Sequence, residues 1–457
     1  MANLFSALKG FFSSGTYNAA ETSHKRKTPA GRPRSVDAML PNYKRHRAVE
    51  NARDLERNFA VASWAVRRHL DYVSTFNFEP KTGNPGLDQE LVALMQWYEQ
   101  PENCHVARRH SLSQIIRLAE AMRTVDGDLL LVKLRSGHLQ AIEGDRIQDP
   151  PDRIPTTEDN PWINGVRTTK SGKAQSYGIH KRDKFGTYSW ERAVLAENCW
   201  HHGYFQRFDQ VRGVSPLTSA LDTFRDAYEG FDYALSKLKL TQMFGLVITR
   251  DSGDEVGDHD GEGDVDFGDG PIKLELDAND DAKFIESQSP SLEFQQFTQA
   301  MLGVALKSLD IPYSFYDEAH TNFFGSRSAF THYQKSARAK RAANIKLLDS
   351  ITRWRLAGFI SEGRLDANLE DLNWEWVPEG VTWWNPQQEV AADIAAIQAG
   401  LTSRTRVVKE KLGVEWTEIA SELDAEEKVL VDQRGFLFDV SETELLDNDF
   451  GEVIDDE

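Results

Sequence analysis

The chain has 457 residues, 40% hydrophobic and 27% charged, which is an ordinary composition for a folded protein. Its formal net charge of −19 excludes a protein that grips nucleic acid over its whole surface, because such a surface repels phosphate. No apolar run approaches the roughly 20 residues that span a bilayer, and we expect no secretory signal. The two cysteines, Cys104 and Cys199, are too few for a disulfide framework, so a reducing cytoplasm is the expected compartment.

Charge is unevenly distributed along the chain. Residues 1–57 are basic, whereas the chain from Glu415 onward is strongly acidic. This polarity suits a subunit that meets different partners at different ends. Residues 1–45 are predicted to form a basic arm whose first apolar residues, Leu4, Leu8 and Phe11, anchor it on a neighbouring subunit rather than in a membrane.

The first half of the chain changes from a helical to a strand-like pattern. One continuous helix is predicted over 47–73, with one apolar face on which residues recur with a period of about 3.6. These residues are Leu55, Phe59, Ala62, Val66, Leu70 and Val73. Further helices are predicted within 86–100 and within 111–125, the latter capped by Ser111. Short strand-like runs then follow at 127–134, 137–144, 176–182 and 186–195, separated by Gly, Asp and Pro. An α+β region is therefore expected.

The second half contains long helices around an acidic insertion. A helix that begins near Pro216 leads into a strand at 245–250, and a second strand at 271–276 precedes a helix at 289–309. A polar and aromatic segment, 310–328, then leads to a long basic helix from Ser328 to about Phe359. Trp-rich strands within 373–386 and short helices at 386–399 and 402–412 follow.

The acidic insertion, residues 251–270, partly matches a calcium-binding loop. Its carboxylates fall at alternate positions with a glycine at the sixth, close to the EF-hand rule. They belong to Asp258, Asp260, Glu262, Asp264, Asp266 and Asp269. An EF-hand needs a helix on each side of its loop, and here both flanks are strand-like. We therefore expect a flexible acidic loop without metal, with calcium binding as the alternative.

No motif in the chain predicts catalysis. The stretch GVRTTKSGKA at 165–174 has the wrong spacing for a phosphate-binding loop, and a turn between two strands explains it better. Neither cysteine has a second one at C-x-x-C spacing, so zinc binding with His105, His201 or His202 is not expected. Asp126 and Asp128 lie in a predicted turn, where aspartate is common for backbone hydrogen bonding. No enzyme activity and no cofactor are expected.

The long basic helix has two interpretations. Lys335, Arg338 and Arg341 lie within reach of one face, where they could contact nucleic-acid phosphates. A solvated face or an inter-subunit salt-bridge surface is equally consistent with the pattern. Apolar residues further along the helix, Leu347, Leu348, Ile351 and Trp354, are expected to pack in a core.

Several stretches, taken together, resemble the portal proteins of tailed bacteriophages of the lambda type. They are 52–73, LQAIEGDRIQDP at 139–150, RGVSPLTSAL at 212–221, 297–330 with its proline turn before a Ser/Arg-rich helix, and 383–416 with an N-P step and a Gly-Leu-x-Ser-Arg turn. The matches keep the family's order and cover roughly residues 45–430. The acidic insertion at 251–270 and the acidic tail after 430 depart from the family pattern.

The resemblance implies an elongated α+β subunit of a twelve-membered ring. Residues 46–217 and 328–385 would form an α/β wing, 218–245 and 289–311 paired stem helices, and 246–288 a small strand-containing clip. Residues 312–327 would form a tunnel loop lining the narrowest part of a channel, and 386–457 a helical crown followed by the acidic tail. The tunnel-loop residues of interest are Tyr313, Asp317, Glu318, His320, Asn322, Phe323, Phe324 and Arg327. Lys335, Arg338 and Arg341 are candidates for steering DNA.

The resemblance also implies the partners and the place of action. The ring would stand at the capsid portal vertex of the virion, after assembly in the host cytoplasm, and would conduct double-stranded DNA in and out. It would dock the large terminase subunit during packaging, a head–tail adaptor afterwards, and capsid or scaffold protein, with no membrane involved. The competing hypotheses are another head–tail structural protein such as an adaptor, a calcium-binding interaction protein, and a nuclease or packaging ATPase.

Overall fold

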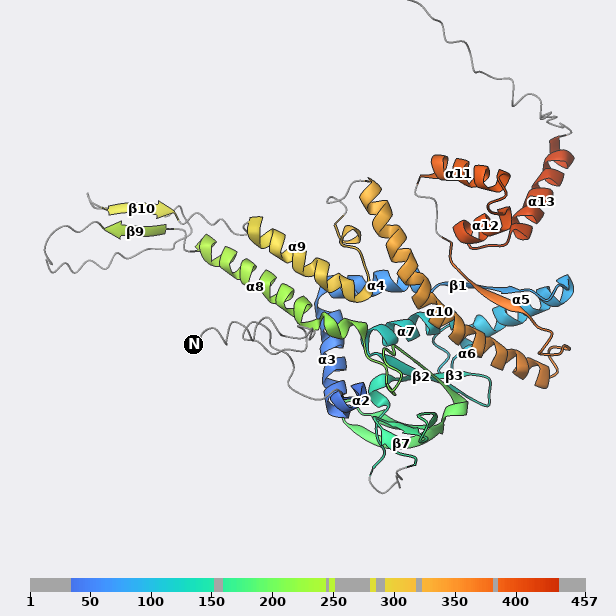
Figure 1. Ribbon diagram of the computed structural model, residues 1–457, viewed down its shortest axis with the longest axis horizontal. Helices are drawn as coiled ribbons and strands as arrows, with labels where there is room; N and C mark the ends of the chain where they lie inside the picture. Colours follow the sequence, from blue (N-terminus) through green and yellow to red (C-terminus); the bar gives the residue numbers. More distant parts are fainter. Residues whose placement is uncertain are drawn as a thin grey trace, which may run out of the picture.

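The computed structural model describes residues 34–151, 159–243, 246–250, 280–284, 292–317, 323–380 and 385–434 (Figure 1). The helices are α2 (Val36–Met39), α3 (Asn42–Asn58), α4 (Ala60–Val73), α5 (Pro85–Glu99), α6 (Pro101–Cys104), α7 (Leu112–Val125), α8 (Leu221–Met243), α9 (Leu292–Leu306), α10 (Phe323–Ser361), α11 (Pro386–Gln398), α12 (Arg404–Leu412) and α13 (Trp416–Arg434). The strands are β1 (Phe76–Pro80), β2 (Asp128–Lys133), β3 (Leu139–Glu143), β4 (Trp162–Ile163), β5 (Val166–Thr168), β6 (Ala174–Arg182), β7 (Tyr188–Leu195), β8 (Cys199–Gly203), β9 (Leu246–Arg250), β10 (Asp280–Phe284) and β11 (Trp374–Pro378). The mixed helix-and-strand class expected from the sequence is confirmed.

The long helix predicted over 47–73 is two helices, so that prediction was wrong. Phe59 separates α3 from α4 with an extended backbone (φ −114°, ψ 108°). Its buried ring packs edge-on against Phe224 and Tyr228 of α8. Burial of the ring between the helices offsets the interruption of the backbone. The expected buried face of α4 is correct, because Ala62, Val66, Leu70 and Val73 all lie in the core.

Strands β2 to β8 form two antiparallel sheets, of order β3-β2-β8 and β4-β5-β6-β7. All four strand-like runs predicted between 127 and 195 are strands. The stretch at 165–174 contains β5 and the turn that joins it to β6, so the expected turn between two strands is confirmed. The short strand β8 was not predicted. It pairs with β2 along Asp128–Val132, whose residues are buried. Ser111 caps α7 as expected, within a capping box completed by Gln114.

Helix α10 joins two hydrophobic cores. Its first half contributes Tyr333 and Ala337 to a core shared with α4, α8 and α9. Its second half contributes Leu347, Leu348 and Ile351 to a core shared with α5, α7 and β2, as expected, and Trp354 packs against that core. With 39 residues, α10 is about 58 Å long, long enough to connect both cores in one rigid element.

Helices α8 and α9 pack against each other and project from the body as a pair, with the strands β9 and β10 at the far end (Figure 1). We call α8 and α9 the stem. The strands pair antiparallel, Leu246 opposite Phe284 and Arg250 opposite Asp280. The strand predicted at 271–276 lies outside the described residues, and β10 is the partner of β9.

The C-terminal helices α11, α12 and α13 form a separate group beside the body (Figure 1). The expected helices 386–399 and 402–412 are confirmed, whereas α13 was not predicted. Gly413 ends α12 with φ +73°, and Gly380 lies so close to the end of α12 that a side chain there would meet the backbone of Lys411. This contact holds the group beside strand β11. No helix in the described ranges is both long and apolar enough to cross a membrane.

Candidate functional site

A fully buried arginine, Arg212, joins strand β2 to the segments that follow β3 and β4. Arg212 donates from Nε and Nη2 to the two carboxylate oxygens of Asp128, at 2.7 and 2.8 Å. Its remaining N–H groups donate to the carbonyl oxygens of Gly144, Ile147 and Asn164, at 2.7 to 2.8 Å. All five donors of the guanidinium are therefore satisfied, which is the condition for burying this charge without a large penalty.

The carboxylate of Asp128 has further hydrogen-bond partners besides Arg212. It accepts hydrogen bonds from the backbone N–H of Gly213 at 2.7 Å and shares one with His201 Nε2 at 2.9 Å. Burial alone would raise the pKa of Asp128, but Arg212 and His201 lower it far below its usual range. Asp126 likewise binds Arg53 rather than only the backbone of a turn. Arg212 also connects two stretches that carried the resemblance, because it begins 212–221 and donates to the carbonyl oxygens of Gly144 and Ile147 within 139–150.

A second buried polar cluster joins α4, α7 and β8 to α10. His69 and Glu120 share a hydrogen bond of 2.8 Å, and Arg123 donates to Glu120 at 3.0 Å. His202 Nε2 donates to Asn344 Oδ1 of α10 at 3.0 Å. Burial, and then the charge of Arg123, lower the pKa of His202 to about 4. The neutral form of His202 is therefore the one that the fold accommodates.

This cluster predicts a loss of stability in acid. The unfolded chain protonates His202 near its ordinary pKa of 6.5, whereas the folded chain does so only near 4. The contribution of His202 to the free energy of unfolding is fully present above pH 6.5 and is lost as the pH falls toward 4. At pH 5 the free energy of unfolding is expected to be lower than at neutral pH by about 2 kcal/mol. His202→Gln keeps a donor for Asn344 but cannot be protonated, so the variant is expected to lack this part of the pH dependence. Urea unfolding of both proteins at pH 7 and pH 5 measures it, and an unchanged pH dependence in the variant would contradict the assignment.

The two cysteines are buried, and the histidines that follow Cys199 are hydrogen-bonded. Cys104 and Cys199 are buried, and burial raises the pKa of each thiol to about 12. His201 and His202 pair with Asp128 and Asn344. Within the described ranges, no three His, Cys, Asp or Glu side chains are placed to hold a metal ion. The six carboxylates of the acidic insertion, from Asp258 to Asp269, lie outside those ranges.

The segment 312–327, predicted to be a loop, is partly helical. The chain from Tyr313 to Phe315 forms a single helical turn, and the rings of Tyr313 and Tyr316 lie 5.6 Å apart. Helix α10 begins at Phe323 rather than Ser328, so Phe323, Phe324 and Arg327 belong to its first turns and not to a loop. Of the other loop candidates, Asp317 closes the turn through its N–H to Tyr313, and Glu318, His320 and Asn322 lie outside the described residues.

The stem and this turn enclose an apolar hollow of about 590 Å³. Phe231 and Leu235 line it from α8, Phe294 from α9, and Tyr313 and Tyr316 from the turn. Helix α8 also exposes Tyr233 (72%). Helix α9 exposes Phe297 (63%) and Val304 (65%). Apolar side chains of this size remain in water at a cost unless another surface covers them.

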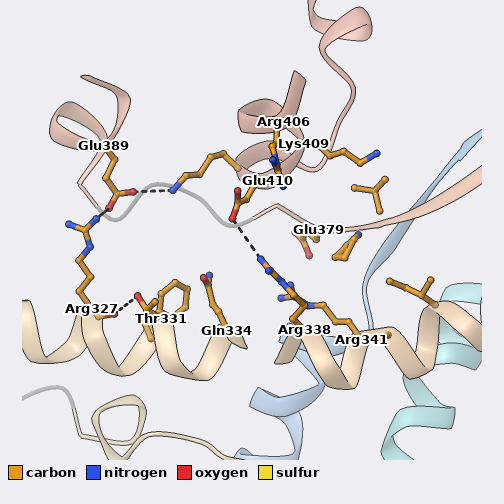
Figure 2. Close-up of a pocket in the computed structure, with 16 residues that line it drawn as sticks. Arg327, Thr331, Gln334, Arg338, Arg341, Glu379, Glu389, Arg406, Lys409 and Glu410 are labelled. Atoms are coloured by element: carbon orange, nitrogen blue, oxygen red, sulfur yellow. Dashed lines mark hydrogen bonds and ion pairs between the residues drawn. The ribbon is translucent and has the colours of Figure 1, made fainter. Parts of the chain in front are cut away.

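A charged groove lies between α10 and the C-terminal helices (Figure 2). It has a volume of about 540 Å³. Glu389 of α11 bridges Arg327 at 3.3 Å and Lys411 at 3.2 Å, and Arg338 lies 4.0 Å from Glu410 (Figure 2). We call this the α10 groove. Its partners on α11 and α12 were not predicted, because nothing in the local pattern of α10 indicates which distant segment packs beside it.

The three basic residues proposed for steering DNA have different environments. Lys335 is exposed and lies outside the residues that line the α10 groove. Arg338 lines the groove with a side chain that is 84% exposed. Arg341 is half-buried, and its Nε donates to the carbonyl oxygen of Tyr72 at 2.6 Å, so it also holds α10 against α4. Only Arg338 and Arg341 therefore share one surface.

The family model for phage portal proteins of the lambda family matches residues 24–341. The match covers well over half of the chain, and the chain belongs to this family, with the role of a phage portal protein. The stretch at 383–416 that also resembled the family lies beyond the matched residues. No curated protein matches the chain.

The backbone of this chain is similar to that of chains in three solved assemblies. The first, "Virion of native gene transfer agent (GTA) particle", has 13% identity and a TM-score of 0.49, over 79% of this chain and 92% of that one. "Neck of empty GTA particle computed with C6 symmetry" has 13% identity and a TM-score of 0.47, over 76% and 89%. "Neck of native GTA particle computed with C12 symmetry" has 12% identity and a TM-score of 0.45, over 76% and 88%.

Proposed function

We propose that this portal protein assembles into a closed ring of twelve subunits at the capsid portal vertex of the virion, and that the ring conducts double-stranded DNA. In this proposal the terminase motor docks on the ring during packaging and a head–tail adaptor binds it afterwards. Capsid or scaffold protein surrounds the ring during assembly in the host cytoplasm. The chain acts as a conduit without an active site of its own, and the motor supplies the energy.

The exposed apolar side chains of the stem are the observation that supports a ring. Two helices that project from a body bury little by themselves, and α8 and α9 leave Tyr233, Phe297 and Val304 largely exposed. Covering one such side chain stabilises an interface by about 1.5–3 kcal/mol. A neighbour that presents the opposite side of its own stem covers them in a head-to-tail contact, and head-to-tail contacts that close generate a ring.

The charge of the chain supports a conduit rather than a DNA-binding protein. Multiple phosphate contacts give tight, salt-dependent adhesion, which would stall a moving duplex. A net charge of −19 for each subunit opposes such adhesion. We assign the wing to the body around α7 and α10, the clip to β9 and β10 with the acidic insertion, the tunnel loop to the turn at Tyr313, and the crown to α11–α13.

Electron microscopy of the purified full-length chain tests this proposal. Closed rings with a central hole are the expected result. Monomers at all concentrations, or open helical filaments, would overturn the proposed ring. The isolated chain is also expected to lack ATP hydrolysis, and detectable turnover would favour a packaging enzyme instead.

A further inference from the structure

The α10 groove has an excess of positive charge. Six cationic side chains and three carboxylates line it. The cations are Arg327, Arg338, Arg341, Arg406, Lys409 and Lys411, and the carboxylates are those of Glu379, Glu389 and Glu410. At one end of the groove Glu389 bridges Arg327 and Lys411. Lys409 is paired with Glu79, Glu375 and Glu415. At the other end Arg338, Arg341 and Arg406 share two carboxylates, Glu379 and Glu410, which leaves an excess of one positive charge there (Figure 2).

These three arginines are poorly compensated. Among the residues that the structure describes, Arg338 has one ion pair, the 4.0 Å contact with Glu410, and both side chains are largely exposed. Arg341 donates to a neutral carbonyl. Burial, and then the charge of Arg338, lower its pKa, whereas the nearby charge of Glu379 acts in the opposite direction. Among the described residues, no carboxylate lies within ion-pair distance of Arg406. A cluster of like charges with this geometry favours an anionic occupant.

The rest of the lining indicates which kind of anion fits. Phe330, Ile345 and Val377 add apolar surface among the cations. A volume of about 540 Å³ is in the range of small-ligand sites, too small to admit a duplex. The three interleaved carboxylates also oppose a uniformly negative duplex. The groove thus suits an extended segment in which acidic and apolar residues alternate.

The chain itself contains such a segment after α13. Residues 435–457, GFLFDVSETELLDNDFGEVIDDE, combine apolar residues with acidic ones and contain no Lys or Arg. The acidic residues are Asp439, Glu442, Glu444, Asp447, Asp449, Glu452, Asp455, Asp456 and Glu457. We call this segment the acidic tail. Its composition is complementary to the groove in both charge and apolar content.

The acidic tail is long enough to reach the groove of its own subunit. Helix α13 begins at Trp416, just after Gly413, which lies against Gly380 and Pro378 at the edge of the groove. The 19 residues of α13 span about 28 Å. The 23 residues from 435 to 457 span up to about 75 Å when extended. Folding back along α13 therefore leaves ample length for contact.

We propose that the acidic tail docks in the α10 groove of its own subunit, with its carboxylates on Arg338, Arg341 and Arg406 and its apolar side chains on Phe330, Ile345 and Val377. Docking shields the basic groove from passing DNA. It also adds a contact that holds the C-terminal helices against α10.

A binding assay with a synthetic peptide tests the proposal. The probe is fluorescein-labelled peptide 435–457, and the receptor is the full-length chain with its nine tail carboxylates changed to Asn or Gln, which leaves the groove vacant. The anisotropy of the peptide is expected to rise on binding. Adding Arg338→Glu and Arg406→Glu is expected to weaken the affinity by at least about tenfold, because both sites then repel the peptide.

The matched control is Lys335→Glu with Lys346→Glu. These are two exposed cations of the same helix outside the groove, and their reversal changes the net charge equally. The control is expected to leave the affinity within about twofold. If circular dichroism shows that the Glu variant misfolds, Arg338→Gln with Arg406→Gln provides the same comparison. An affinity unchanged by either groove variant would overturn the proposal.

Two further measurements test occupancy by the chain's own tail. The unmodified chain is expected to bind the peptide about tenfold more weakly than the tail-neutralised chain, because its groove is already filled. Equal affinities would overturn the proposal. A short DNA duplex that binds the tail-neutralised chain more tightly than the peptide, in a manner abolished by Arg338→Glu with Arg406→Glu, would assign the groove to nucleic acid. None of these outcomes depends on ring formation, so the proposed function is tested separately.

Discussion

Replacing Arg212 with methionine is expected to lower the free energy of unfolding by about 3–5 kcal/mol, because removing one partner leaves the other as an uncompensated buried charge. Asp128 would retain its contacts with Gly213 and His201 but lose both hydrogen bonds to the guanidinium. Three carbonyl oxygens, those of Gly144, Ile147 and Asn164, would also lose a donor. Urea unfolding followed by circular dichroism measures the change.

The control for this experiment is Arg192→Met. The Arg192 side chain is 42% exposed and pairs with Glu191 at the surface, so its removal is expected to cost less than about 0.5 kcal/mol. The double variant Arg212→Met with Asp128→Asn is expected to recover part of the loss, because no charge then remains unpaired. A loss below about 1 kcal/mol for Arg212→Met would contradict the structural role of the pair.

The importance of Arg212 could not be predicted from the sequence. The stretch that begins at Arg212 was recognised as characteristic of the family, but its partner Asp128 is 84 residues away and lies in a different predicted element. Aspartate in a turn has a sufficient local explanation, so the pattern gave no reason to expect a buried ion pair. Long-range polar contacts of this kind have no period or spacing along the chain.

Changing Phe297 and Val304 of α9 to aspartate is expected to abolish ring assembly while the subunit remains folded. Both side chains are more than half exposed in the isolated subunit, so the body does not depend on them. In the proposed ring each lies in an interface, where burying a charge without a partner costs several kcal/mol. Because that cost recurs at every interface, the fraction of protein in rings is expected to fall by more than about tenfold.

The matched control is Gln296→Asp with Gln295→Asp, which adds the same charge to exposed positions on the same helix. Size-exclusion chromatography and electron micrographs report assembly, and circular dichroism reports folding. Rings in the Phe297 and Val304 variant at the level of the control would show that the stem does not form the interface, and the proposed ring would then need another contact.

Periodic patterns predicted the parts of the fold that local physics determines. The buried face of α4, the capping box at Ser111 and the apolar half of α10 follow from spacing and capping chemistry, and all are confirmed. The break at Phe59 was missed because it depends on two rings of α8, far away in the sequence. The partners of Arg338 and Arg327 were missed for the same reason, since they come from α11 and α12.

The pairing of β9 with β10 determines how well the subunit tolerates insertions and deletions in the segment between these two strands. Arg250 and Asp280 are paired, so the chain leaves the stem and returns to it at a single point. The free energy needed to bring the ends of the intervening segment together grows slowly, by about 0.6 kcal/mol for each doubling of its length. The tip is therefore a permissive position for insertion. A fluorescent tag or binding epitope placed there, or deletion of residues 254–269, should leave α8 and α9 unchanged, which offers a practical position for labelling the subunit.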